Sequence, residues 1–285
     1  MEFQAFDDAH GPPGLGARAS QALTLPSFSR HLNALMLATD QNEIWTLTCR
    51  FFRDLGFAHA IYGYSPDSFG ARLGAPEDYL VMSTLSADVE TTLVNQLFYR
   101  QSATFHWALE NAGVASWSMD QEDCGVGDWF ELDPAAQEFF TRNDLLIGCT
   151  IGFPKNSSRG NAVMALVGPP DKTQEDIDAL LAVAREVVFV AAASAHRCLS
   201  VLPYPTPRGH LTLRQREVLE WVAEGKTSAD IATIMGISAP TVDKHLRLAR
   251  DTLGVDTTAQ ALIKAAFLNQ VFLIDPSPSE TSARS

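Results

Sequence analysis

One stretch near the C-terminus decides the fold of that region: LTLRQREVLEWVAEGKTSADIATIMGISAPTVDKHLRLARDTL, residues 211–253. Thr212 and Gln215 form a Thr-x-x-Gln pair, the signature of a capping box in which side chains and backbone N–H groups satisfy each other at a helix start. Gly225 and Gly236 stand where helices end, because glycine adopts the left-handed conformation of a C-terminal cap without steric cost. The stretch therefore predicts three short helices.

The third of these helices, which begins after Ser238, has two distinct faces. Its apolar residues recur at steps of four, three and four, at Val242, Leu246, Ala249 and Leu253. At 100° per residue, the opposite side carries Pro240, Lys244, Arg247 and Leu248, flanked by Thr241, Asp243, His245 and Arg250. A helix fits the major groove of DNA, where Arg binds guanine through two hydrogen bonds. Periodicity alone allows either a DNA-binding helix or a solvated face of a small bundle.

Residues 211–232 and 237–246 closely resemble the LuxR-type (GerE-like) helix-turn-helix, with Gln215 in place of its usual Glu. This resemblance implies a DNA-binding domain and favours the first interpretation. We expect Arg247 to be the principal base reader; the full set of expected DNA contacts is Thr241, Lys244, His245, Arg247 and Arg250. Asp243 departs from the basic or polar residue common in the family. A carboxylate accepts from cytosine but is repelled by phosphate, so we expect an unusual DNA sequence to be read.

Composition divides the chain into an acidic part and a nearly neutral part. The formal net charge is −13, and residues 1–207 carry 25 acidic against 12 basic side chains. The helical region must therefore bind DNA through placed contacts rather than bulk attraction. We expect the following organisation: a flexible arm over 1–26, a sensing domain over 27–200, a Pro-rich linker over 201–209, a four-helix DNA-binding domain over 210–272 and a disordered tail over 273–285.

The sensing domain is predicted to be an α/β/α sandwich, which makes the whole chain α+β with an all-α C-terminal domain. Apolar periodicity predicts one helix over 28–55, ended by Gly56, and further helices over 86–101, 134–142 and 173–197. Strands are expected over 58–64, 146–153 and 162–167, the last two joined by a polar turn. Helices before and after an antiparallel hairpin indicate a central sheet covered on both sides.

Three segments of this domain resemble the autoinducer-binding domain of quorum-sensing LuxR regulators. They are LGFA (55–58) followed by YGY (62–64), HWALEN (106–111) leading to ASWS (115–118), and GCTIGFP (148–154). The resemblance implies a LuxR-type transcription regulator that responds to a small, apolar signal molecule. An acyl-homoserine lactone is the signal class that such a domain usually takes.

The polar residues that hold acyl-homoserine lactones in this family are largely replaced. Members carry a Trp and a Tyr four residues apart and an Asp nine residues after the Tyr. Counted back from Trp117, the retained wall against the lactone ring, these positions fall on Val89, Leu93 and Ser102. We expect weak binding of ordinary lactones, and a less polar or differently shaped ligand, or none, unless a nearby residue takes the anchor role. The expected cavity lining is Tyr62, Tyr64, Val89, Leu93, Ser102, Phe105, Trp107 and Trp117.

Apolar patterns indicate the oligomeric state of the protein, and the motifs missing from its sequence indicate its cellular location. We expect a homodimer on a near-palindromic operator, formed through the long helix over 173–197 and an exposed stripe on the fourth C-terminal helix, Ala261, Leu262, Ala265 and Leu268. The sequence shows no secretory signal and no apolar run of 18 residues. Its four scattered cysteines, Cys49, Cys124, Cys149 and Cys198, suit reduced thiols. A cytoplasmic protein is expected.

The motifs that mark other classes of function are missing from the sequence. No Gly-x-Ser-x-Gly, P-loop or zinc motif occurs, so we expect neither an enzyme nor a bound cofactor or metal. Two alternatives remain open: a LuxR-type regulator that works without a ligand, its pocket filled by its own side chains, and an inhibitory partner that heterodimerises with a related regulator.

Overall fold

The computed structural model describes residues 16–69, 79–118, 132–155, 159–203 and 209–272. The chain divides into two compact units, residues 1–202 and residues 203–285, called here the N-terminal and C-terminal units. The expected disordered tail over 273–285, most of the linker and residues 1–15 of the expected arm lie outside the described residues. No helix in the described part of the chain is long and apolar enough to cross a membrane.

The N-terminal unit is built on a five-stranded antiparallel sheet in the order β2-β1-β5-β4-β3. The strands are β1 (His59–Phe69), β2 (Leu80–Ser83), β3 (Gly113–Ser116), β4 (Gly148–Gly152) and β5 (Arg159–Val167). β5 is the central strand, and β1 pairs with it along most of its length, with Tyr62 opposite Met164. Sequence reasoning found β1, β4 and β5 but neither β2 nor β3, each of which is only four residues long.

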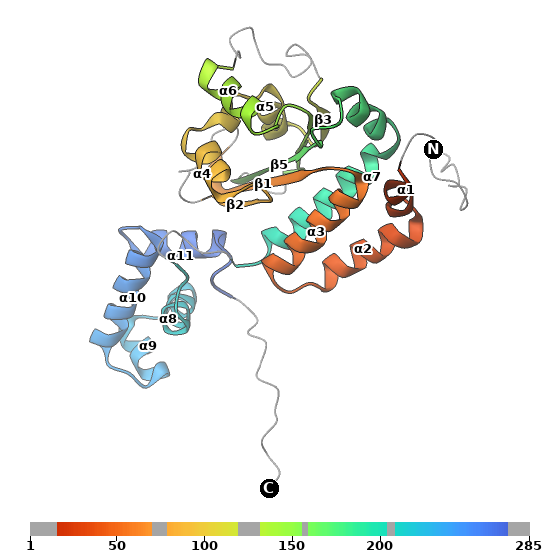
Figure 1. Ribbon diagram of the computed structural model, residues 1–285. Helices are drawn as coiled ribbons and strands as arrows, with labels where there is room; N and C mark the ends of the chain where they lie inside the picture. Colours follow the sequence, from red (N-terminus) through yellow and green to blue (C-terminus); the bar gives the residue numbers. More distant parts are fainter. Residues whose placement is uncertain (1–15, 70–78, 119–131, 156–158, 204–208, 273–285) are drawn as a thin grey trace. The chain divides into compact units, whose positions relative to one another are not determined.

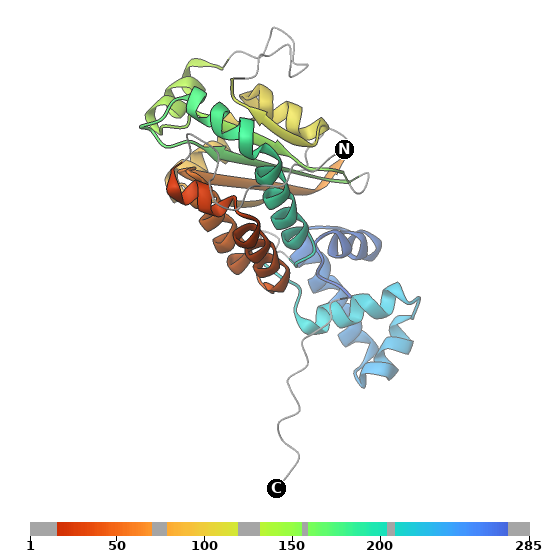
Figure 2. The same ribbon diagram turned by 90° about the vertical axis from the view of Figure 1, so that its right-hand side faces the viewer.

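Helices cover both faces of this sheet, as Figures 1 and 2 show. On one face lie α1 (Ala17–Ala22), α2 (Leu25–Leu37), α3 (Gln41–Leu55) and α7 (Gln174–Ser200). The other face carries α4 (Ala87–Asn95), a 3-10 turn (Phe98–Gln101), α5 (Ala103–Glu110) and α6 (Pro134–Arg142). The expected α/β/α sandwich is therefore confirmed.

The main hydrophobic core lies between the sheet and the α3–α7 layer. Side chains from three elements pack together there and are almost completely buried, among them Phe52 of α3, Leu166 of β5 and Leu181 of α7. Burying each such side chain contributes roughly 1.5–3 kcal/mol before entropic costs. The apolar stripe of α7 is thus used within the unit. The side chains that α7 leaves exposed include Val183 and Val190.

Two expectations for the first sixty residues are wrong. The arm expected to continue to residue 26 is helical from Ala17, because Ala19 and Ala22 pack into the unit. The single helix expected over 28–55 is two helices. Asp40 breaks it, since its carboxylate accepts from the backbone N–H of Glu43 and caps α3.

The C-terminal unit consists of α8 (Leu213–Ala223), α9 (Ser228–Met235), α10 (Ala239–Leu253) and α11 (Thr258–Phe267). The predicted capping box of Thr212 and Gln215 is present, and similar boxes begin α9 and α11. Gly236 ends α9 at φ +66°, as a left-handed C-terminal cap requires. The inward stripe of α10 is buried as expected, at Val242, Leu246, Ala249 and Leu253.

Our expectation that α11 exposes an apolar stripe is wrong. Ala261, Ala265 and Leu268 are buried against the rest of the C-terminal unit, with exposed fractions of 0%, 0% and 2%. These side chains join Val218, Leu219 and Ile231 in the core of a small helical domain. The exposed large apolar side chain of α11 is Ile263.

Candidate ligand cavity and nucleic-acid interface

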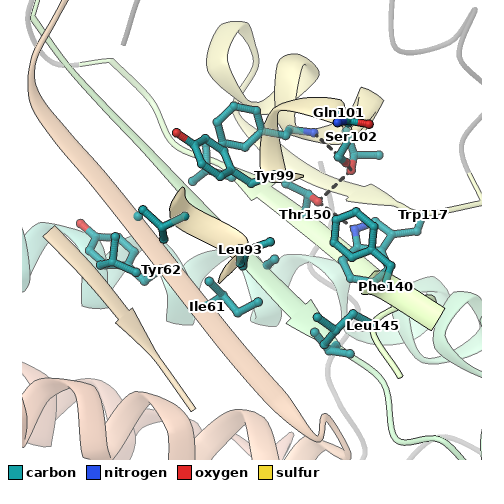
Figure 3. Close-up of a pocket in the computed structure, with 18 of the residues that line it drawn as sticks. Ile61, Tyr62, Leu93, Tyr99, Gln101, Ser102, Trp117, Phe140, Leu145 and Thr150 are labelled. Carbon is teal, nitrogen blue, oxygen red and sulfur yellow. Dashed lines mark hydrogen bonds between the residues drawn. The ribbon is translucent and has the colours of Figure 1, made fainter. Parts of the chain in front are cut away.

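A cavity of about 680 Å³ lies between the sheet and the α4–α5–α6 layer of the N-terminal unit (Figure 3). This volume falls within the range of pockets that bury small organic ligands. Its walls are mainly apolar: the sheet contributes Ile61, Val163, Ala165 and Val167, and the helical layer contributes Leu93, Val94, Leu109 and Phe140. Among the described lining residues there is no Asp, Glu, Lys or Arg.

One corner of the cavity is polar and internally hydrogen-bonded. The Trp117 indole N–H donates to Thr150 Oγ1 at 2.8 Å, and Thr150 Oγ1 lies 2.8 Å from Thr104 Oγ1. Thr104 Oγ1 in turn lies 3.0 Å from Ser102 Oγ. Ser102 also caps α5, where its oxygen accepts from the Phe105 backbone N–H. We call Ser102, Thr104, Thr150 and Trp117 the hydroxyl chain.

A glycine lets α5 bring its part of this chain close to the sheet. A Cβ atom on Gly152 of β4 would lie 2.1 Å from the carbonyl oxygen of Asn111 and 2.7 Å from that of Ala108. Any side chain there would push α5 away from β4, and with it Thr104 away from Thr150. The glycine of the GCTIGFP segment therefore has a packing role beside the cavity.

A second polar group borders the cavity at Tyr79 and Tyr99. Arg100 donates to both phenol oxygens, to Tyr79 at 3.2 Å and to Tyr99 at 3.3 Å. Burial raises the pKa of Tyr79 to about 12. The backbone oxygen of Arg100 is 2.7 Å from His106 Nε2, which fixes the turn. Sequence reasoning missed both tyrosines; the available signal was Tyr99, three residues before Ser102.

Tyr62 and Tyr64, which we expected in the cavity, direct their side chains to the other face of the sheet. The Tyr62 hydroxyl is 2.9 Å from Nδ1 of His196 on α7, and the Tyr64 ring also packs against that imidazole. Side chains alternate along a strand, so Ile61 and Gly63 face the cavity. Tyr62 and Tyr64 still border the cavity, although the Tyr62 hydroxyl and the Tyr64 ring lie against His196. Burial lowers the pKa of His196 to about 4, with a smaller contribution from the charge of Arg197, and raises that of Tyr62.

The other expected lining residues divide into two groups. Leu93, Ser102, Phe105 and Trp117 border the cavity. Val89 faces a smaller hollow of about 350 Å³ between α4 and α6, and Trp107 lies beside Gly113, outside the lining. The structure thus brings together two of the three positions that replace the lactone anchors.

In the C-terminal unit, the outward face of α10 is exposed as the periodicity predicted. Lys244 is exposed, and the Arg247 side chain is 59% exposed and 3.3 Å from Asp251. An exposed ion pair of this kind is worth roughly 0–1 kcal/mol, so Arg247 is available to a stronger partner. Thr241 and His245 are half-buried beside them, and the Thr241 hydroxyl is 2.8 Å from Ser238 Oγ.

Two side chains on the flank of α10 are engaged within the unit. Arg250 donates to Thr258 Oγ1 at 3.0 Å, which ties α10 to the start of α11. Asp243 accepts from the Ser228 hydroxyl at 3.0 Å, which ties α10 to α9. The sequence pattern could not show these contacts, since both partners lie on neighbouring helices.

Two family models match the two units. Residues 40–199 match the autoinducer binding domain, and residues 209–265 match the bacterial regulatory proteins of the luxR family. The chain belongs to the LuxR family. It is accordingly a DNA-binding transcription regulator of the LuxR quorum-sensing type, and the family consists of regulators rather than enzymes.

Several LuxR-family proteins are similar to this chain. The quorum sensing-dependent transcriptional regulator RpaR of Rhodopseudomonas palustris is 33% identical over 145 residues, which are 50% of this chain and 57% of RpaR. The transcriptional activator SolR of Ralstonia nicotianae is 25% identical over 84% of this chain and 97% of SolR. The crystal structure of Escherichia coli SdiA aligns at 17% identity and a TM-score of 0.49, over 85% of this chain and 97% of SdiA.

Proposed function

We propose that this regulator binds a small, largely apolar signal molecule in the cavity beneath α4, α5 and α6, and that it binds a near-palindromic operator as a homodimer in the cytoplasm. The observation that carries the proposal is the cavity itself. A volume of about 680 Å³ with apolar walls and two polar corners suits a molecule with an acyl chain and a compact head.

The same observation favours this function over a ligand-independent regulator. A pocket filled by its own side chains would leave no such volume, because protein interiors pack at close to crystal density. Leu93 and Val94 line one wall without closing it.

Base reading is assigned to Arg247, with support from Lys244, Thr241 and His245. Its support is the exposed position of Arg247 on the outer face of α10 and its weak pairing with Asp251. Arg250 contributes less to base reading in this proposal, because its guanidinium already holds Thr258. Exposed Val183, Val190 and Ile263 support a dimer.

Thermal unfolding with a panel of neutral acyl compounds, acyl-homoserine lactones included, tests the ligand site. A bound compound should stabilise the N-terminal unit by about 3 kcal/mol when its concentration is roughly 100 times the dissociation constant. The matched control is Ala165→Trp, which places a large ring in the cavity from the central strand β5. No stabilisation of the wild-type protein by any compound, or equal stabilisation of both proteins, contradicts the proposal.

A further inference from the structure

The hydroxyl chain at the polar corner contains one hydrogen more than it can use. Trp117, Thr150, Thr104 and Ser102 supply four hydrogens, one from the indole and one from each hydroxyl. Three contacts join these four residues: Trp117 to Thr150, Thr150 to Thr104, and Thr104 to Ser102. The Phe105 N–H uses an oxygen lone pair of Ser102 and no hydrogen. One hydroxyl hydrogen is therefore left over, whichever way the chain is oriented.

This surplus hydrogen lies at the cavity wall, where a bound ligand would cover it. Thr104 and Thr150 are 5% and 3% exposed, Ser102 is half-buried, and all four residues line the cavity; Figure 3 labels Ser102, Thr150 and Trp117 there. A buried donor without an acceptor is unfavourable, so the ligand is favoured if it brings an acceptor atom to this corner. A pure hydrocarbon would leave the donor unsatisfied.

The described lining also limits the charge of the ligand. It contains no basic side chain to pair with a carboxylate and no acidic side chain to pair with an amine. An unpaired charge taken from water into such a site is strongly disfavoured. The favoured acceptor is thus a neutral carbonyl oxygen.

A ligand N–H finds a poor partner in the same corner. Hydrogen bonds to a charged acceptor are roughly twice as strong as those between neutral groups, and here the acceptors are hydroxyls that are already bonded. An ester oxygen in place of the N–H carries no hydrogen that needs an acceptor, so it avoids this cost on entering the cavity.

We propose, on the basis of the ligand site proposed above, that the hydroxyl chain selects a neutral acyl ester or ketone, held through its carbonyl oxygen, over the corresponding N-acyl amide. Ser102 is the specificity-determining residue. An aspartate at this position would accept the surplus hydrogen through Thr104 and would also accept a ligand N–H with a charged oxygen. It would still cap α5, because Asp and Ser are equally good at a helix N-terminus.

The test uses pairs of compounds that differ in one atom. Each pair consists of an N-acyl-homoserine lactone and its ester analogue, the α-acyloxy-γ-butyrolactone with the same chain, from hexanoyl to dodecanoyl. Dissociation constants are measured by thermal shift and calorimetry for the wild-type full chain, Ser102→Asp and the neutral control Ser102→Asn. We expect the wild-type protein to bind the ester more tightly, by about fivefold or more.

In Ser102→Asp the preference should reverse to the amide, by about tenfold, and Ser102→Asn should not reverse it. If the wild-type protein binds the amide as tightly as the ester or more tightly, the selectivity is overturned while the ligand site stands. If neither compound of any pair binds, the proposed ligand site is contradicted as well, so the two failures are distinguishable.

Discussion

At the scale of single residues, the side chains of α10 differ in how free they are to meet DNA. Arg247 has only an exposed, weak partner in Asp251, whereas Arg250 holds Thr258 at the start of α11. The two arginines are three residues apart and carry the same charge. Their different partners predict different roles, base reading for Arg247 and domain cohesion for Arg250.

Replacing each arginine by alanine should separate these roles. Arg247→Ala should weaken operator binding by about 1–3 kcal/mol and relax base preference at one position, because a bidentate contact to a base is lost. Arg250→Ala should affect the thermal stability of the C-terminal unit more than base preference. Operator titrations with single-base variants measure both. If Arg247→Ala binds the operator with unchanged affinity and unchanged base preference, Arg247 is not the base-reading residue.

The buried pair of Tyr62 and His196 predicts a pH dependence of stability. Burial lowers the folded-state pKa of His196 to about 4, below the value of about 6.5 expected when unfolded. The unfolded chain therefore takes up the proton first. The contribution of this pair is fully present above pH 6.5 and is lost as the pH falls towards 4, by about 3 kcal/mol. His31, whose pKa burial also lowers to about 4, adds to the same slope.

Denaturant unfolding of the N-terminal unit between pH 7 and pH 4 measures this slope. The double variant Tyr62→Phe/His196→Phe is the control, because it removes both partners and leaves no buried polar atom unpaired. Its stability should fall less steeply with decreasing pH than that of the wild-type protein. Parallel curves for the two proteins would show that His196 titrates normally.

At the scale of helices and strands, features set by residues near in sequence could be predicted better than features set by tertiary contacts. The capping box of Thr212 and Gln215 and the glycine that ends α9 depend on neighbours in sequence, and both could be predicted. The side of the sheet that Tyr62 faces could not, because alternation defines two faces without saying which one borders a cavity. The prediction that the α11 stripe is exposed was wrong for a similar reason. Periodicity shows that a helix has an apolar face, but it does not show whether another helix covers that face.

Because Ala261 and Ala265 are buried and Ile263 is exposed, α11 predicts how substitutions on its two faces affect dimerisation. Ile263→Glu should leave the thermal stability of the C-terminal unit nearly unchanged, because Ile263 is 54% exposed, and should weaken both dimerisation and operator binding. Ala265→Glu should unfold the unit instead, since it buries a charge at a position without exposure. Light scattering at micromolar concentration, with and without operator DNA, measures the dimer. A monomeric wild-type protein in both conditions would contradict the proposed homodimer.

At the scale of the whole molecule, the sheet of the N-terminal unit separates two kinds of interior. The α3–α7 side is a filled core with buried Phe52, Leu181 and the Tyr62–His196 pair. The α4–α6 side leaves a cavity with the hydroxyl chain in one corner. A domain that keeps about 680 Å³ open gives up packing contacts that a filled core would make. A bound ligand restores those contacts, so we expect the purified protein to retain one in the cavity.

Mass spectrometry of the small molecules extracted from the purified protein shows whether the cavity holds a ligand. Wild-type protein and Ala165→Trp are purified in parallel from cells of the bacterium that carries the gene, and their extracts are compared at equal protein concentration. We predict a neutral compound with an acyl chain and a carbonyl group, stoichiometric with the wild-type protein and absent from the variant. Identical extracts from two folded proteins that bind the operator equally well would contradict the account.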